Sequence, residues 1–179
     1  MALKATIFKV DVSITDMDRN YYQEHHLTIA RHPSETDARM MLRVVAFILN
    51  ASETLEFTKG LSEVDDPDIW QKNMTDDIEL WIELGQPSEQ RLKKGCNQSQ
   101  KMLVYSYEDG VFEQWWNKEK NKVWMRDNLT VTTIAPELAE QLSSAVKRHM
   151  QIQATIQDGQ MWLSIDEASF EITPIEQKQ

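Results

Sequence analysis

The chain has 179 residues, of which 41% are hydrophobic and 27% are charged, with only five glycines and five prolines. This composition excludes a disordered or fibrous protein, and we expect residues 1–179 to form a single domain around one substantial core. The formal net charge of −10 argues against a protein that coats nucleic acid through bulk electrostatics. Cys96 is the only cysteine, which excludes an internal disulfide and a cysteine-cluster metal site.

The hydrophobic segments give no sign of a membrane span or of a signal peptide. The longest apolar run, residues 40–49, is interrupted by Arg43 and is too short to cross a bilayer. The amino terminus alternates polar and apolar residues, whereas a signal peptide joins a basic start to a hydrophobic block. A single cysteine also fits a reducing compartment. We therefore expect a cytoplasmic protein that does not associate with membranes, and we favour a monomer.

Alternation of apolar and polar residues is the main strand signal. It predicts strands over residues 5–15, 22–31, 68–70, 78–85, 102–107, 129–134, 152–156 and 161–165, with a further strand over 170–175. The Asp158-Gly159 pair lies between two alternating runs and predicts a hairpin turn. Turn-rich residues 16–20 predict a second hairpin near the amino terminus. We expect strand 78–85 to be amphipathic, with Glu83 on its polar face.

Four helices are predicted between and beside these strands. Ser34 is the expected N-cap of the first, which should end near Asn50. Ser88 is the expected cap of a helix that extends to about Gln98. Further helices are predicted over residues 111–122 and from Pro136-Glu137 onward. Helices and strands that alternate between two terminal hairpins predict a mixed α/β (α+β) fold, in which a mixed sheet is flanked by helices and the hairpins form an added sheet.

The charge of the chain is unevenly distributed. Residues 91–126 carry eight Lys or Arg against four Asp or Glu, whereas the segments on both sides are acidic. Arg91, Lys93 and Lys94 belong to this basic segment. They are either a solvated helix surface, which is what most charge runs are, or a footprint for a phosphate-bearing ligand such as nucleic acid.

Two acidic residues mark the strongest candidate site. Asp68 follows a proline at the head of one predicted strand, and Glu83 is near the end of the next. If these strands pair antiparallel, with a turn near Met74-Thr75, the two carboxylates meet at one edge of the sheet. Converging carboxylates suit Mg²⁺ or Mn²⁺, and such an ion could activate water and neutralise charge on a phosphodiester.

The same region resembles the YaeQ family of bacterial proteins. The resemblance rests on Pro67-Asp68-Ile69-Trp70-Gln71-Lys72, on Glu79-Leu80-Trp81-Ile82-Glu83-Leu84-Gly85-Gln86-Pro87, and on the hydrophobic pattern through residues 150–162. It implies a variant of the PD-(D/E)XK nuclease-like fold, whose core order is helix, three strands, helix and strand. It further implies that Asp68 is the motif aspartate, Glu83 the second acid, and Glu35 an acid on the first core helix, so that the three hold the metal.

One position departs from the nuclease pattern. Active members of that superfamily place a lysine two residues after the second acid, and this position is Gly85 here. A bulge at this glycine could turn Gln86 toward the site. Alternatively, the following helix could supply Lys94 or its neighbour Arg91, which are three residues apart and share one flank. A degenerate, inactive site is equally consistent with the residues present.

Two hypotheses of function follow. The first is a metal-dependent phosphodiesterase that acts on nucleic acid, with Asp68, Glu83, Gln86 and Lys94 in the catalytic site and Arg91, Lys93 and Lys94 binding the substrate. The second is a non-catalytic binding or regulatory protein whose partner is nucleic acid or a transcription-associated protein, because the family name has been linked with transcription elongation. Fold alone does not separate the two.

Overall fold

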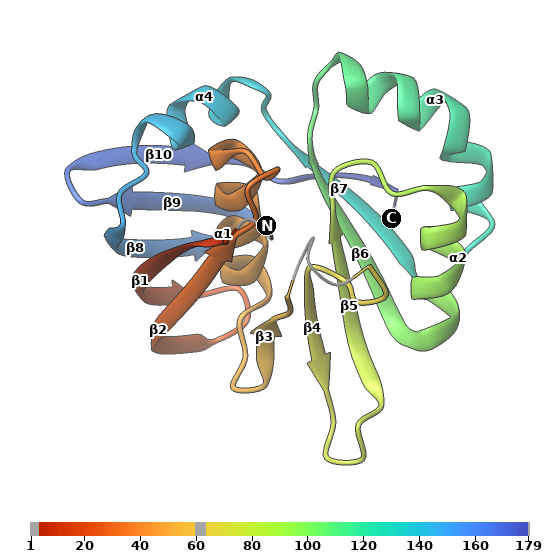
Figure 1. Cartoon of the computed structure of the whole chain (residues 1–179), viewed down its shortest axis with the longest axis horizontal. Coiled ribbons are helices and arrows are strands. Elements are labelled where there is room, and N and C mark those ends of the chain that lie inside the picture. Colours follow the sequence, from red (N-terminus) through yellow and green to blue (C-terminus); the bar gives the residue numbers. More distant parts are fainter. Residues whose placement is uncertain (1–3, 60–63, 179) are drawn as a thin grey trace.

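A computed structural model describes residues 4–59 and 64–178 and has two β-sheets and four helices (Figure 1). In chain order the elements are β1 (Thr6–Asp16), β2 (Tyr21–Arg31), α1 (Asp37–Asn50), β3 (Leu55–Phe57), β4 (Ile69–Lys72), β5 (Ile78–Leu84), α2 (Glu89–Gln98), β6 (Ser99–Tyr107), α3 (Gly110–Trp124), β7 (Leu129–Ile134), α4 (Glu137–Ser144), β8 (His149–Gln157), β9 (Gln160–Ile165), β10 (Ala168–Ile172) and β11 (Ile175–Lys178).

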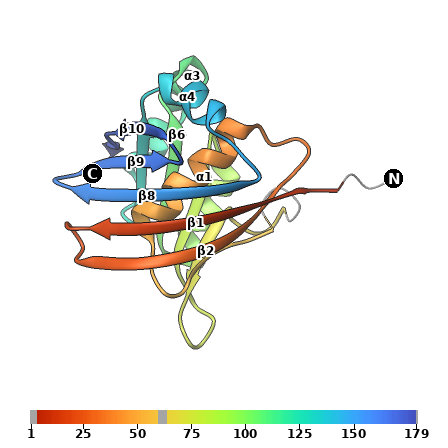
Figure 2. The same ribbon diagram turned by 90° about the vertical axis from the view of Figure 1, so that its left-hand side faces the viewer.

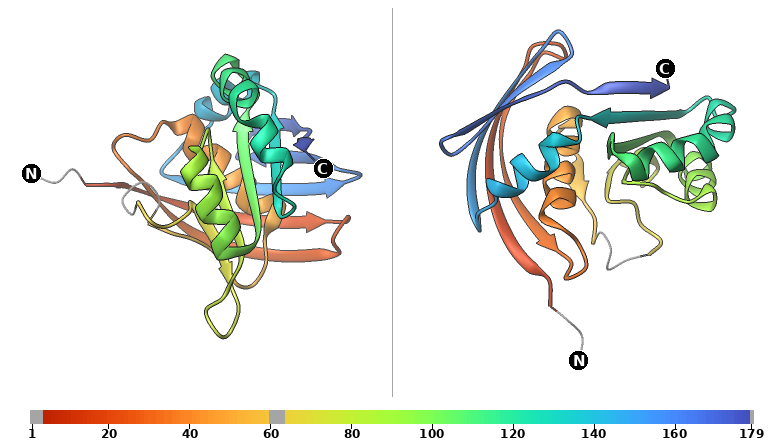
Figure 3. Two further views of the ribbon diagram at one scale, coloured as in Figure 1. Left: turned by 90° about the vertical axis from the view of Figure 1, so that its right-hand side faces the viewer. Right: turned by 90° about the horizontal axis from the view of Figure 1, so that it is seen from above.

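The elements form four layers. The five-stranded sheet has the order β10-β9-β8-β1-β2, and the six-stranded sheet has the order β11-β7-β6-β5-β4-β3. Helices α1 and α4 lie between the sheets, whereas α2 and α3 cover the outer face of the six-stranded sheet (Figure 3). Both sheets contain parallel and antiparallel pairs, because β1 runs parallel to β8 and β6 runs parallel to both β5 and β7. The predicted mixed α/β class is confirmed.

The two terminal hairpins join into one sheet, as the sequence predicted. Strands β1 and β8 pair directly, so that the hairpins β1–β2 and β8–β9 become a single surface (Figure 2). Alternate residues of β1 point inward and are almost fully buried: Phe8, Val10, Val12 and Ile14. The β8–β9 turn is made by Asp158 and Gly159 with φ of 54° and 75°, the left-handed conformation that an Asp-Gly hairpin turn needs.

Helix α1 begins later than predicted. Thr36, not Ser34, is its N-cap, and the Thr36 hydroxyl accepts a hydrogen bond from the backbone N–H of Arg39 at 3.1 Å. Ser34 instead forms a hydrogen bond with the ring of His32. All residues from Met40 to Ile48 are buried, because the helix is enclosed between two sheets rather than lying on the surface of one.

The six-stranded sheet contains two strands that the pattern did not predict, β3 and β11, and both are too short to show a clear alternation. The strand predicted over 170–175 ends at Ile172, and β6 begins three residues before the predicted start. Strand β5 is not amphipathic as expected. Both of its faces are covered, so Trp81 is 1% exposed and Glu83 is buried as well.

The order α1, β3, β4, β5, α2, β6 is helix, three strands, helix and strand. This is the core order that the family resemblance implies. Membership of the nuclease-like superfamily itself stays a prediction. Within the described ranges, none of the helices is long and apolar enough to cross a membrane.

Candidate functional site: a buried arginine–carboxylate cluster

Asp68 and Glu83 lie at the same end of the β4–β5 pair, as their spacing predicted. The strands are antiparallel, with Ile69 opposite Ile82, and the backbone N–H of Asp68 donates to the carbonyl of Ile82 at 3.0 Å. The Asp68 carboxylate also accepts a hydrogen bond from the backbone N–H of Leu84 at 3.0 Å. Asp68 is 4% exposed and Glu83 6%, so both acids are buried at this edge.

Glu35 joins them from the segment just before α1, not from the helix itself as the resemblance implied, because the helix begins at Asp37. Its two carboxylate oxygens accept from Arg39 at 2.6 Å and from Arg43 at 2.7 Å. Arg39 also reaches Asp68, with Nη2 at 2.9 Å from Oδ1. One guanidinium therefore links the acid that precedes the helix to the acid that precedes β4. Burial opposes the charge of Arg39, but the Asp68 and Glu35 carboxylates outweigh it and raise the pKa of Arg39.

Arg43 holds Glu35 from the deepest part of the cluster. It is 2% exposed, donates to the carbonyl of Ala30 at 3.0 Å, and stacks over the ring of Phe57. Its Nε atom is buried and has no hydrogen-bond partner within the part of the chain that the structure describes. Burial lowers the pKa of Arg43 in spite of the neighbouring Glu35 carboxylate.

Glu83 has a separate set of partners. Its Oε1 accepts from the indole N–H of Trp81 at 3.0 Å and from the guanidinium of Arg91. Burial raises the pKa of Glu83, and the charge of Asp68 raises it further, while Arg91 acts in the opposite direction. Asp68 and Glu83 are thus near enough to repel each other, and each is balanced by its own arginine.

The three residues of α2 that were predicted to bind a ligand, Arg91, Lys93 and Lys94, have different surroundings. Arg91 reaches Glu83 and also donates to the carbonyls of Val64 and Asp66, so it ties the loop before β4 to β5. Lys94 forms an ion pair with exposed Asp65 in that loop, at 2.8 Å. Lys93 is exposed to solvent. Of the three, Arg91 alone contacts a carboxylate of the cluster.

Gly85 lies just past the end of β5 at Leu84 and leaves the extended conformation, with a φ of +88°, which would allow Gln86 to turn toward the site. The side chain of Gln86 is nevertheless directed to β6, where its Nε2 donates to the hydroxyl of Ser106 at 2.8 Å. Gln86 therefore does not replace the nuclease lysine, because its side chain bonds to Ser106 and not to the acids. The cations that do contact the acids are Arg39, Arg43 and Arg91.

The carboxylates of the cluster are the kind of ligand that divalent cations use, but their oxygens are already engaged. Carboxylates of the kind supplied by Glu35, Asp68 and Glu83 suit Mg²⁺ or Mn²⁺. Both oxygens of Glu35, both oxygens of Asp68 and one oxygen of Glu83 already accept hydrogen bonds. Among residues 4–59 and 64–178, no three acidic, histidine or cysteine side chains are grouped to hold an ion. As placed, the carboxylates fit arginine rather than a metal.

Sequence reasoning missed Arg39 and Arg43. Their signal is present in the spacing, because Glu35, Arg39 and Arg43 follow one another at intervals of four and so fall on one side of the helix and the segment before it. A second signal is Arg43 itself, because a charged residue inside the apolar run of residues 40–49 indicates a buried arginine. A buried arginine needs an acidic partner, and Glu35 is the acid at the right distance along the chain.

The fold and this cluster define a mixed α/β protein with two sheets and a buried arginine–carboxylate site at the end of the β4–β5 pair. The family model described as "YaeQ protein" matches residues 1–174. A protein of Escherichia coli (strain K12), "Uncharacterized protein YaeQ", is 44% identical over 172 residues, which are 96% of this chain and 95% of that protein. The chain belongs to the YaeQ family.

Two solved structures agree with this assignment. The YaeQ protein from Xanthomonas axonopodis pv. citri has a TM-score of 0.93 and 42% sequence identity, and the match covers 97% of this chain and 98% of that one. The YaeQ protein from Pseudomonas syringae also has a TM-score of 0.93, at 29% identity, with 98% of this chain and 97% of that one covered.

Proposed function

We propose that this chain is a non-catalytic binding protein on a nuclease-like scaffold, in which arginines occupy the carboxylates that would otherwise hold a metal. The observation that carries the proposal is the double engagement of Arg39 by Glu35 and Asp68, at 2.6 and 2.9 Å. Charge-assisted pairs of this length, made in a buried site, are costly to break. An ion that entered would have to displace guanidinium groups that the surrounding chain holds in place.

The remaining contacts support the same conclusion. Glu83 is engaged by Arg91, and the loop residues that Arg91 also contacts hold that arginine in position. Gly85 stands in the lysine position, and Gln86 is bonded to Ser106. A nuclease of this superfamily needs a cation free to act on a phosphate, whereas these cations are used to neutralise acids.

We further propose that the partner is anionic and contacts the α2–α3 surface, the outer face formed by those two helices (Figure 3). The basic segment 91–126 builds most of both helices and β6, and it carries eight Lys or Arg against four Asp or Glu in a chain that is acidic as a whole. Lys93 is exposed, and the side chain of Lys118 is 78% exposed. Nucleic acid is the first candidate partner, and an acidic segment of a transcription-associated protein is the second.

Calorimetric titration with Mn²⁺ and with Mg²⁺ tests the arginine-held site. We expect no carboxylate-dependent uptake by the wild type, and measurable uptake by an Arg39→Gln/Arg91→Gln variant, whose acids are released. Circular dichroism checks that the variant is folded, and Arg91→Gln alone is the milder second variant. Tight uptake by the wild type that Asp68→Asn abolishes would reject the proposal.

Fluorescence anisotropy with labelled single- and double-stranded oligonucleotides tests the partner. We expect binding that weakens with salt and is reduced at least about tenfold in Lys93→Glu/Lys118→Glu, because each phosphate contact contributes to counterion release. Lys147→Glu is the matched control, since Lys147 lies near the five-stranded sheet with its side chain 66% exposed. Equal loss in the control variant, or no binding to any oligonucleotide, would reject nucleic acid as the partner.

A metal-dependent phosphodiesterase is the second candidate, and the proximity of Asp68 and Glu83 favours it. Asp68 and Glu83 lie at the same end of the antiparallel β4–β5 pair, and burial together with the charge of Asp68 raises the pKa of Glu83. The same oligonucleotides, incubated with Mn²⁺ or Mg²⁺, would then be cleaved by the wild type and not by Asp68→Asn or Glu83→Gln. Cleavage with that dependence would replace the binding-only proposal.

A further inference from the structure

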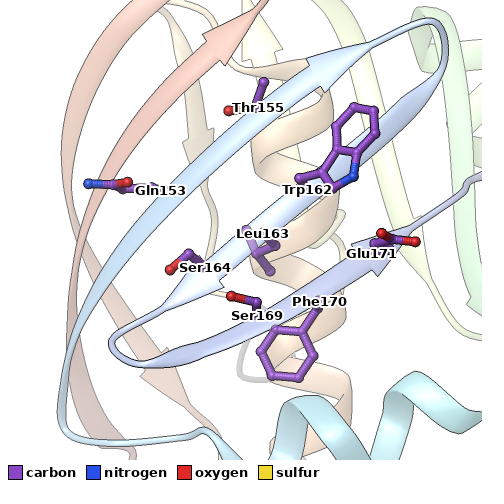
Figure 4. Close-up of a pocket in the computed structure, with 8 residues that line it drawn as sticks. All are labelled: Gln153, Thr155, Trp162, Leu163, Ser164, Ser169, Phe170 and Glu171. Carbon is purple, nitrogen blue, oxygen red and sulfur yellow. The ribbon is translucent and has the colours of Figure 1, made fainter.

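The outer face of the five-stranded sheet carries a second candidate site, far along the chain from the arginine–carboxylate cluster. Eight residues line a depression of about 390 Å³ across β8, β9 and β10, and the six other than Leu163 and Phe170 lie on the outer face of the sheet (Figure 4). They form two rows at right angles to the strands. One row is Thr155, Trp162 and Glu171, and the other is Gln153, Ser164 and Ser169. The neighbouring Leu163 is buried in the core beneath them.

Trp162 is the apolar centre of this depression. Its exposed fraction is 41%, whereas Trp81 in the six-stranded sheet is 1% exposed. The indole stands at the middle of its row, between Thr155 on β8 and Glu171 on β10 (Figure 4). An exposed indole ring surrounded by polar groups is the arrangement that binding sites use for amphipathic ligands, because the ring offers a flat apolar surface and an N–H donor.

Hydrogen bonding separates the two halves of this sheet face. Within residues 4–59 and 64–178, no hydrogen bond or ion pair is made by the side chains of Trp162 or its five polar neighbours. The other half of the same face is different. There Asp11 accepts from Gln151 at 2.9 Å and lies 2.6 Å from ring nitrogens of both His26 and His149. One half of the surface is thus self-paired, and the half around Trp162 is available to a ligand.

The charge of the lining restricts the ligand. Glu171 is the only ionisable residue among those that line the depression, and no lysine or arginine is among them. Phosphates and nucleic acids are therefore disfavoured by repulsion from the carboxylate. Hydroxyl, amide and carboxylate side chains match a ligand with many hydroxyl groups, because each hydroxyl can both donate and accept.

We propose that this depression, the Trp162 pocket, binds a neutral carbohydrate chain. The C–H face of one sugar ring stacks on the indole, and its hydroxyls bond to Thr155, Glu171 and the parallel row that begins with Gln153. Neighbouring strands are about 4.8 Å apart, so the polar groups of a row are spaced on the scale of one sugar unit. This binding is separate from the proposed anionic partner, which contacts the opposite side of the molecule.

Titrations with maltotriose, cellotriose and tri-N-acetylchitotriose, followed by calorimetry and by saturation-transfer NMR, test the proposal. We expect at least one of these neutral trisaccharides to bind, and Trp162→Ala to weaken that binding at least about tenfold, because the alanine removes the large apolar surface and the N–H donor of the indole. Glu171→Gln should weaken it less, since the amide keeps one acceptor. Trp162 is on the surface, so the alanine variant should stay folded, which thermal unfolding verifies.

Trp124→Ala is the matched control, because Trp124 is 53% exposed at the end of α3, on the other side of the protein. It should leave the affinity unchanged. The proposal is overturned if none of the three trisaccharides binds, if Trp124→Ala weakens binding as much as Trp162→Ala, or if a labelled oligonucleotide competes with the trisaccharide at this pocket.

Discussion

Arg39 and Asp68 are 29 positions apart in the chain, yet the guanidinium of the first donates to the carboxylate of the second at 2.9 Å. The same guanidinium donates to Glu35. Helix α1 is thereby fixed to the start of β4 through one side chain that is only 24% exposed. Each partner has lost most of its hydration, so each depends on the others for compensation.

Replacing Arg39 by methionine should therefore destabilise the protein strongly. The change leaves the Asp68 carboxylate without a cation, and breaking a buried ion pair in this way costs about 3–5 kcal/mol. Urea denaturation at neutral pH measures the free energy of unfolding. The double variant Arg39→Met/Asp68→Asn is the control and should recover part of the loss, because it removes the acid left without a cation while Glu35 still pairs with Arg43. A single variant within about 1 kcal/mol of the wild type would contradict this account.

Gly95 shows how closely α2 approaches the sheet. A Cβ atom at this position would lie 2.4 Å from Sδ of Met102 and 3.0 Å from Nε1 of Trp81. Helix propensity alone would favour alanine by about 1 kcal/mol. Overpacking of a buried contact costs about 1–3 kcal/mol, so Gly95→Ala should be destabilising on balance. It should also disturb the hydrogen bond that Trp81 donates to Glu83.

Gly110→Ala is the matched control for Gly95. Gly110 is also a glycine within a helix, at the first turn of α3. In contrast to Gly95, nothing lies within 4 Å of a Cβ atom built at this position. The alanine should be neutral or stabilise by up to about 1 kcal/mol, because it restricts the unfolded chain. Thermal and urea unfolding of both variants measure the two effects. The difference between them gives the cost of overpacking at Gly95, and Gly110→Ala gives the effect of replacing a glycine where there is room. Equal effects of the two substitutions would contradict the close approach of α2.

Much of the fold could be predicted because its periodic signals are local. The alternation in β1 and the Asp158-Gly159 turn identify strands and a hairpin from neighbouring residues alone. Strand β3 has three residues, too few for a period to appear. Both faces of β5 are buried because other elements of the fold cover them. The residues of the strand itself do not indicate which elements these are. At such positions the tertiary environment, and not the strand propensity or the residue pattern, decides which side chains are buried.

The candidate site also has a part that could be predicted from the sequence and a part that could not. The convergence of Asp68 and Glu83 followed from one antiparallel pairing and one turn, which sequence spacing can suggest. The role of Arg39 could not follow from that pairing, because it requires the distance between α1 and β4, which are joined by a long connection and packed in different layers. A helical interval of four marks Arg39 as a partner of Glu35 and leaves its second partner undetermined.

The raised pKa of Glu83 predicts a specific pH dependence. Burial and the charge of Asp68 make the folded state bind a proton at Glu83 more tightly than the unfolded chain does. The free energy of unfolding should therefore fall as pH rises from the ordinary carboxyl range through the raised pKa. Glu83→Gln cannot ionise and should lack this component. Urea denaturation of both proteins from about pH 4.5 to about pH 8 measures it. Parallel pH profiles for the two proteins would contradict the prediction.

The adjacent histidines of β2 should titrate in opposite directions. Successive strand residues face opposite sides of a sheet, so His25 and His26 have different surroundings. The ring of His25 faces inward against Phe47 and lies 2.6 Å from the hydroxyl of Tyr21, and burial lowers its pKa below 6.5. His26 is exposed, and its hydrogen bond with Asp11 raises its pKa above that value.

NMR titration of the imidazole resonances measures both values in one experiment. Asp11→Asn should bring the pKa of His26 back toward its ordinary value, because the carboxylate that favours the imidazolium is gone, and it should leave His25 low. The stabilisation that His26 gives the folded state is present below its unfolded pKa and is lost as pH rises through the raised folded pKa. Because Asp11 also contacts His149, the variant tests the whole outer network of β1, β2 and β8. If both rings of the wild type titrate together, the opposite orientation of the two side chains is wrong, and with it the register of β1 against β2.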